Sequence, residues 1–116
     1  MKNSFFFLTA CLLIIGVTGF GQQEQVSFKK TVVTNDFVAE GCAVGDVNKD
    51  GRPDIMAGSF WFESPSWKRH EIAPPEIFKP TEYSNSFLQF SMDVNQDGWI
   101  DLVRVGYPGE AATWYE

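Results

Sequence analysis

The amino-acid sequence predicts an all-β protein made of two similar units, each with an acidic loop between two strands. Three observations support this prediction. The segment from Asp46 to Ile55 recurs further along the chain as Asp93 to Leu102. Short apolar runs bounded by Gly and Asp flank both copies, which is typical of short strands. No stretch after residue 21 keeps an apolar i, i+3, i+4, i+7 stripe over the ~11 residues of an average helix.

Each unit is expected to consist of an apolar strand, the acidic loop, a second strand, a turn and an aromatic strand. The aromatic segment 61–63 recurs as 114–116, with an insertion before the second copy. Pro74, Pro75 and Pro80 exclude regular structure and predict a connecting loop between the units. The expected strands are 31–33, 37–44, 55–57, 61–63, 67–72, 87–92, 102–105 and 114–116.

Both acidic loops have the spacing Asp-x-Asn-x-Asp-Gly-x-x-Asp, which predicts a calcium site. Calcium prefers about six to eight hard oxygen ligands in a flexible geometry. Oxygens at positions 1, 3 and 5 converge on one point, and Gly at position 6 permits the positive φ that turns the chain around the ion. Position 7 offers its backbone carbonyl and position 9 a further carboxylate. The predicted ligands are Asp46, Asn48, Asp50, Arg52 and Asp54 in the first loop, and Asp93, Asn95, Asp97, Trp99 and Asp101 in the second.

Two alternatives compete with a calcium-binding β-hairpin loop. An EF-hand needs a bidentate Glu at position 12 and flanking helices, but that position holds Ala57 in one loop and Arg104 in the other. The second alternative is an Asp/Asn/Gly-rich turn without metal. Three carboxylates in one short loop would repel one another without a cation. The presence of every ligand position in both loops therefore favours calcium.

Residues 1–21 are predicted to be a cleavable export signal of the bacterial type. Lys2 supplies a positive start, Phe5 to Val17 is almost wholly apolar, and Gly19 and Gly21 occupy the positions that a signal peptidase reads. We expect cleavage before Gln22 and a secreted or cell-surface product. A retained anchor would need ~20 apolar residues, and a lipoprotein cut at Cys11 would leave too short an apolar core in front; both are the less favoured alternatives.

The formal net charge of −6 argues against nucleic acid or an anionic membrane as a partner. Much of the negative charge lies in the two loops, where bound cations would cancel part of it. Cys42 is the single cysteine after residue 21, so no disulfide within the cleaved chain is expected. Its apolar neighbours predict that the Cys42 thiol is buried.

The segment from Gly45 to Ile55 resembles the FG-GAP/VCBS repeats of secreted bacterial proteins and of the integrin α-chain head. The likeness extends over about residues 37–116. It implies four-stranded blades of a β-propeller with calcium in the hairpin loops, and extracellular binding or scaffolding. Accordingly, the chain divides into a signal peptide (1–21), a lead-in (22–36), a first repeat with its linker (37–80) and a second, truncated repeat (81–116).

Two repeats form an incomplete ring, because propellers need at least about four blades. Further repeats in a longer chain are the favoured expectation, and oligomerisation is the alternative. The expected function is a secreted calcium-binding module that binds an extracellular glycan or protein, or serves as a scaffold. The alternative is a non-catalytic part of a polysaccharide-active enzyme.

The sequence predicts no enzyme, because His70 is the single histidine and no nucleophile elbow or phosphate loop occurs. His70 is expected on a half-exposed strand. Trp61, Trp67 and Trp114 are expected to pack between sheets, whereas Trp99, at loop position 7, is expected to face solvent.

Overall fold

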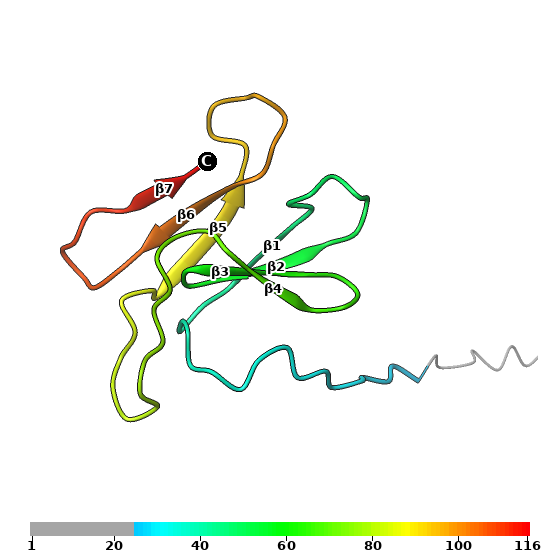
Figure 1. Ribbon diagram of the computed structural model, residues 1–116, viewed down its shortest axis with the longest axis horizontal. Coiled ribbons are helices and arrows are strands. Elements are labelled where there is room, and N and C mark those ends of the chain that lie inside the picture. Colours follow the sequence, from blue (N-terminus) through cyan, green and yellow to red (C-terminus); the bar gives the residue numbers. More distant parts are fainter. Residues whose placement is uncertain (1–24) are drawn as a thin grey trace, which may run out of the picture.

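The computed structural model describes residues 25–116, so the predicted signal peptide lies outside the described residues. The described part is all-β, as predicted, and consists of two antiparallel sheets (Figure 1). It contains no helix that is long and apolar enough to cross a membrane. The first sheet has the strand order β1 (Ala43–Gly45), β2 (Asp54–Ala57), β3 (Phe60–Glu63) and β4 (Lys68–Glu71). The second has the order β5 (Leu88–Met92), β6 (Asp101–Val105) and β7 (Thr113–Tyr115).

The strands of the first sheet form because alternate side chains can be buried on its two faces. Along β2 and β3, buried and half-buried residues alternate with the period of two that a pleated strand imposes. Phe60 and Phe62 are both 2% exposed on one face, and Met56 is 2% exposed on the other. Both faces of this sheet are therefore covered.

The two sheets pair their first three strands in the same register. Met56 lies opposite Ala43 and Trp61 in the first sheet. Val103, at the corresponding position of the second sheet, lies opposite Phe90 and Trp114. The sequence recurrence is thus accompanied by identical strand pairing, although β7 has no strand on its other side among residues 25–116.

Two separate apolar clusters hold the molecule together. The first, the lead-in cluster, joins one face of the first sheet to the preceding chain through Val38, Phe60 and Phe62, with Val33 and Trp67 packed against them. The second, the inter-sheet cluster, is built around Ala43, Met56 and Leu102, with Trp61, Ile72, Ile100 and Tyr115 packed against them. The sheets approach closely beside Gly45, where a Cβ would lie 2.9 Å from the Ile100 side chain.

The second sheet leaves its other face open. Leu88 is 56% exposed, and Phe90 and Trp114 are 47% and 46% exposed. These residues share a face because Leu88 pairs with Val105, and Phe90 and Trp114 both pair with Val103. We call the surface of Leu88, Phe90, Val103, Val105 and Trp114 the open face.

Most predicted strands are confirmed, and the differences have simple causes. Residues 31–33 are not in a strand. Of the predicted strand 37–44, only residues 43 and 44 belong to β1, which extends to Gly45. Phe37 instead makes an isolated antiparallel bridge to Phe78. The predicted burial of Cys42 is wrong: the buried Ala43 follows it in the strand, so alternation turns Cys42 outward.

The tryptophans follow the expectations in part. Trp61 packs against the inter-sheet cluster, as expected. Trp67 packs instead against the lead-in cluster, on the face of the first sheet that does not meet the second sheet. Trp99 is 48% exposed, as expected for loop position 7. The expected packing of Trp114 between sheets is wrong, because it belongs to the open face, which no second sheet covers in the described residues.

Replacing Gly58 by Ala should destabilise the first sheet more than any other Gly-to-Ala change at a positive φ. Gly58 has φ +62°, and an added Cβ would lie 2.2 Å from the backbone oxygen of Val38. Gly109 has φ +94° but open space around the same position, so Gly109→Ala is the matched control. We expect a loss of more than about 2 kcal/mol for Gly58→Ala and about 1 kcal/mol for the control. Urea unfolding measures both, and equal losses would show that the Val38 contact yields freely.

Candidate metal centre

The two acidic loops occupy the same place in their sheets. Residues 46–53 connect β1 to β2, and residues 93–100 connect β5 to β6. Both connections join neighbouring antiparallel strands, so each acidic loop closes a β-hairpin. This position agrees with the hairpin form expected from the sequence and differs from the helix-flanked loop of an EF-hand.

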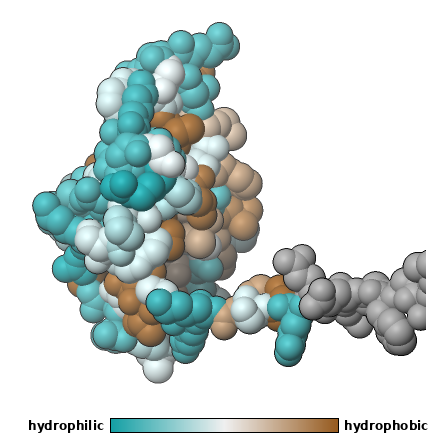
Figure 2. Space-filling view, turned by 90° about the vertical axis from the view of Figure 1, so that its right-hand side faces the viewer, coloured by the Kyte–Doolittle hydropathy of each residue, from teal (hydrophilic) through white to brown (hydrophobic). Residues whose placement is uncertain are grey.

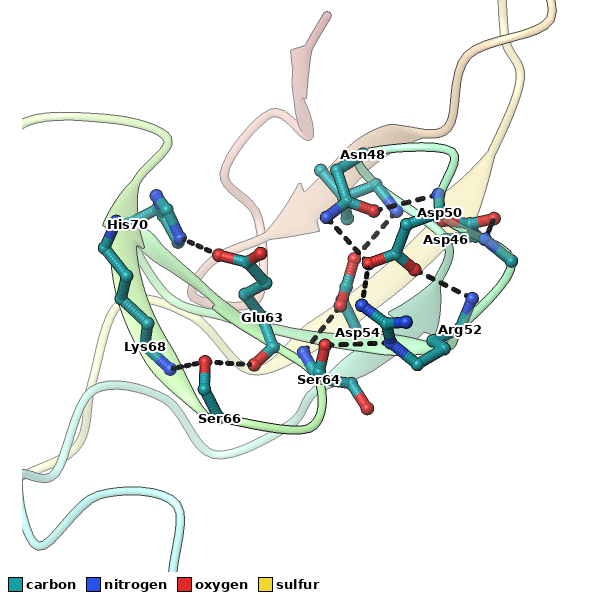
Figure 3. A network of polar contacts seen from close by, with 12 residues as sticks. Asp46, Asn48, Asp50, Arg52, Asp54, Glu63, Ser64, Ser66, Lys68 and His70 are labelled. Atoms are coloured by element: carbon teal, nitrogen blue, oxygen red, sulfur yellow. Dashed lines mark hydrogen bonds and ion pairs between the residues drawn. The ribbon is translucent and has the colours of Figure 1, made fainter.

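The polar side chains of the first loop point back at its own backbone (Figure 3). The Asp46 carboxylate accepts hydrogen bonds from the Asp50 amide at 2.9 Å and from the Gly51 amide at 2.8 Å. Asn48 Oδ1 also accepts from the Asp50 amide, at 3.1 Å, and Asp50 Oδ1 accepts from the Arg52 amide at 2.9 Å. Positions 1, 3 and 5 thus present their oxygens to the inside of one tight turn.

The second loop repeats these contacts. The Asp93 carboxylate accepts from the amides of Asp97 at 3.0 Å and Gly98 at 2.8 Å. Asn95 Oδ1 accepts from the Asp97 amide at 3.1 Å, and Asp97 Oδ1 accepts from the Trp99 amide at 2.8 Å. The corresponding distances in the two loops agree within a tenth of an ångström, so the loops share one conformation.

Two positive-φ residues turn each loop. Gly51 and Gly98, at position 6, have φ +83° and +85°, where glycine is free of the Cβ penalty. Lys49 and Gln96, at position 4, have φ +58° and +64°. Left-handed residues at position 4 are costly without glycine, and the hydrogen bonds to Asp46 and Asp93 hold them in place.

The position-9 carboxylates are buried at the base of the loops. Asp54 is 0% exposed and accepts from the amides of Val47 at 3.1 Å and Ser64 at 2.8 Å. Asp101 is 1% exposed and accepts from the Val94 amide at 2.8 Å. Among the described residues, nothing donates to the buried Asp101 Oδ1. One carboxylate is therefore fully bonded, and its counterpart has a free oxygen.

The surroundings of position 5 differ between the loops. Arg52 Nη2 lies 2.6 Å from Asp50 Oδ2 on the exposed rim of the first loop. In the second loop Trp99 replaces this arginine, and the Lys49 ammonium lies 3.7 Å from the centre of its ring. The hydrogen bond from the Trp99 amide, helped by Asn95 and by the Lys49 charge, lowers the pKa of Asp97 from its ordinary value. The Asp97 carboxylate therefore stays ionised to a lower pH than an isolated aspartate.

The donor set of both loops fits a calcium ion by its chemistry. Every predicted side-chain ligand is a carboxylate or amide oxygen, with no nitrogen or sulfur that would favour zinc. In residues 25–116, no three His, Cys, Asp or Glu side chains converge as a ready-made metal cluster, because the carboxylates are directed at loop amides. A carboxylate offers about four lone-pair sites. An oxygen that accepts one hydrogen bond from a backbone amide can therefore still bind a cation.

Two residues near the loops were not expected at the site. Asn95 Nδ2 donates to Glu116 Oε1 at 3.0 Å, which ties the second loop to the end of β7. The corresponding Glu63 instead lies 2.8 Å from His70 Nε2 (Figure 3). The recurrence of the aromatic-Glu segments in the sequence was the available signal, but it did not show which partner each Glu takes.

A cleft of about 460 Å³ opens between the two sheets beside the second loop. Three aromatic rings, those of Trp61, Trp99 and Tyr115, contribute to its walls. Its carboxylates come from Glu71, Asp97 and Glu116, while the remaining lining is aliphatic: Val47, Met56, Ile72, Ile100 and Leu102. The cleft thus joins the candidate cation site to an aromatic surface.

No family model, curated protein or solved structure matches this chain.

The two buried position-9 carboxylates should respond differently to the Asp→Asn substitution. In Asp54→Asn an amide NH₂ must face either the Val47 or the Ser64 amide, so one backbone hydrogen bond is lost. In Asp101→Asn the NH₂ group can take the position of Oδ1, which accepts no hydrogen bond from the described residues, so the bond from the Val94 amide is kept. With chelator present, we expect Asp54→Asn to cost about 1–3 kcal/mol in free energy of unfolding and Asp101→Asn clearly less. Equal losses in urea titrations would contradict these bonding patterns.

Proposed function

We propose that this chain is a secreted, calcium-binding β-repeat module for extracellular binding or scaffolding. The observation that carries the proposal is the shared conformation of the two acidic loops, in which oxygens at positions 1, 3 and 5 face the inside of the turn. An accidental Asp-rich turn need not occur twice with the same contacts. A common ligand is a physical reason for keeping both loops alike.

Calcium suits these loops better than magnesium. Each loop offers three carboxylates and one amide oxygen within nine residues, and magnesium demands a near-ideal octahedron and holds its waters. Residues 46, 48, 50 and 54 would hold the ion in the first loop, with the carbonyl of Arg52, and residues 93, 95, 97 and 101 in the second, with that of Trp99. The bound charge would offset the repulsion among the carboxylates.

The proposal includes propeller-type blades of the FG-GAP/VCBS kind. The four-stranded antiparallel first sheet, with its acidic loop between the first two strands, supports this assignment. So does the second sheet, which stacks on the first with its acidic loop between corresponding strands. Further sheets, in the same chain or in other copies, would complete a ring.

The cleft between the sheets supports a binding role. Trp61, Trp99 and Tyr115 supply aromatic surface and Glu71 supplies a hydrogen-bond acceptor, a combination that suits a glycan. Catalysis is not part of the proposal. His70 Nε2 is paired with Glu63 and its ring stacks on Trp61 at 4.1 Å, which gives the histidine a structural role in the sheet.

Calorimetric titration of the purified protein with calcium should show about two sites per chain, one for each loop. The double variant Asp50→Ala with Asp97→Ala removes the central carboxylate of both loops and should abolish binding. Glu82→Ala, in the connection between the sheets, is the matched loss of an exposed acid and should leave both sites. Unchanged binding in the double variant would sink the calcium assignment.

A further inference from the structure

Residues 28–33 have the sequence pattern of the fourth strand of the first sheet. Phe28-Lys29-Lys30-Thr31-Val32-Val33 matches Trp67-Lys68-Arg69-His70-Glu71-Ile72 as an aromatic residue, two bases, a polar residue, a variable position and a β-branched residue. In the first sheet, residues 68–71 of the later segment form β4. The earlier segment therefore carries the signature of an outer strand.

Among residues 25–116, this earlier segment joins neither of the two sheets. Residues 25–34 belong to no strand. Val26, Phe28 and Val32 are 72%, 93% and 59% exposed, which is high for β-prone apolar side chains. Figure 1 and Figure 2 show this part of the chain running away from the body into open space. It is a strand-like segment without a partner among the described residues.

Val33, the last residue of the segment, packs against a sheet face in the way that Ile72 does after β4. Ile72, which directly follows β4, packs against the inter-sheet cluster between the two sheets. Val33, its counterpart, packs against the lead-in cluster on the opposite face of the first sheet. By this correspondence, residues 28–32 would form the edge strand of a sheet stacked on that face.

Among the described residues, the second sheet lacks the outer strand that the first sheet has. It has three strands where the first has four, and β7 takes the place of β3 but has no neighbour on its outer side among residues 25–116. Its open face carries Phe90, Val103 and Trp114, which correspond in register to Ala43, Met56 and Trp61 of the face that the first sheet buries. A lead-in segment could pair with the outer edge of β7, and a first sheet could cover the open face.

We propose that residues 28–33 of one copy of this chain form the fourth strand of the second sheet of another copy, next to β7. The first sheet of the donor copy then stacks on the open face of the acceptor copy. We take the register from β3 and β4, where Trp61 lies opposite His70 and Glu63 lies opposite Lys68. In the corresponding pairing, Trp114 lies opposite Thr31, and Glu116 lies opposite Lys29. The Glu–Lys pair places opposite charges across the strands.

This contact is head-to-tail, because donor and acceptor surfaces differ. Such contacts close into rings when the rotation permits. Propellers typically hold about four to eight blades, so a ring of two-sheet copies would contain about two to four chains. The inference does not depend on calcium, since strand pairing and the open face involve none of the predicted ligands.

Mixing two single-cysteine variants tests the pairing and its register. Thr31→Cys in one copy and Trp114→Cys in another, both with Cys11→Ser and Cys42→Ser, should give a disulfide between residues 31 and 114, identified by peptide mass spectrometry. The Trp61–His70 stacking shows that these positions project side by side. The control pair Lys30→Cys with Trp114→Cys is shifted by one residue, which turns the thiols to opposite faces, and should cross-link severalfold less.

Sedimentation supplies a readout that leaves Trp114 intact. The unaltered chain should sediment as a defined oligomer of about two to four copies. Val32→Pro removes a strand amide in the exposed segment and should yield monomers, whereas Gln25→Pro, outside the segment, should not. A monomeric unaltered chain, oligomers indifferent to Val32→Pro, or equal cross-linking in the shifted pair would each overturn the proposal.

Discussion

A buried carboxylate at the start of the second strand of each sheet holds the acidic loop and the hairpin together. Asp54 and Asp101 lie almost entirely out of solvent, and each accepts a hydrogen bond from the amide that begins its loop. Burying a charge is costly unless it is paired or hydrogen-bonded. The loop must therefore close over this carboxylate, and its other acids are drawn into the same small space.

The conformation of the acidic loops affects how the two sheets pack against each other. The loops fix the pairing of β1 with β2 and of β5 with β6, and these hairpins carry the side chains that build the inter-sheet cluster. Ile100, the last residue before the Asp101 strand, packs against this cluster. A change in the charge state of a loop would therefore be felt at the contact between the sheets.

The sequence allowed the all-β class and most strands to be predicted, because recurrence and alternation are local signals. The segments 55–57, 61–63 and 102–105 lie within β2, β3 and β6, each of which begins one residue earlier. The burial of Cys42 and Trp114 was wrongly predicted, because burial depends on which face a distant sheet covers. Local sequence also gave no sign that Val33 would pack on the first sheet while residues 31–33 stayed outside any strand.

For the candidate site, the spacing of the acids was sufficient to predict a tight hairpin turn, because the pattern acts within nine residues. The partners from outside the loops were not predictable: Ser64 for Asp54, Glu116 for Asn95 and Lys49 for Trp99. The first two depend on how the third strand is placed, and the last joins residues from both loops. Asp101 keeps an oxygen free of such a partner, so the two sites are alike in conformation and unequal in their surroundings.

Thermal unfolding with and without chelator tests most directly whether the loops depend on calcium. A ligand that binds the folded state alone raises its stability by mass action. The account predicts that chelator lowers the Tm, that added calcium restores it, and that the same concentration of magnesium does so less effectively. A Tm that is indifferent to chelator and to calcium would contradict it and would identify the acidic loops as metal-free turns.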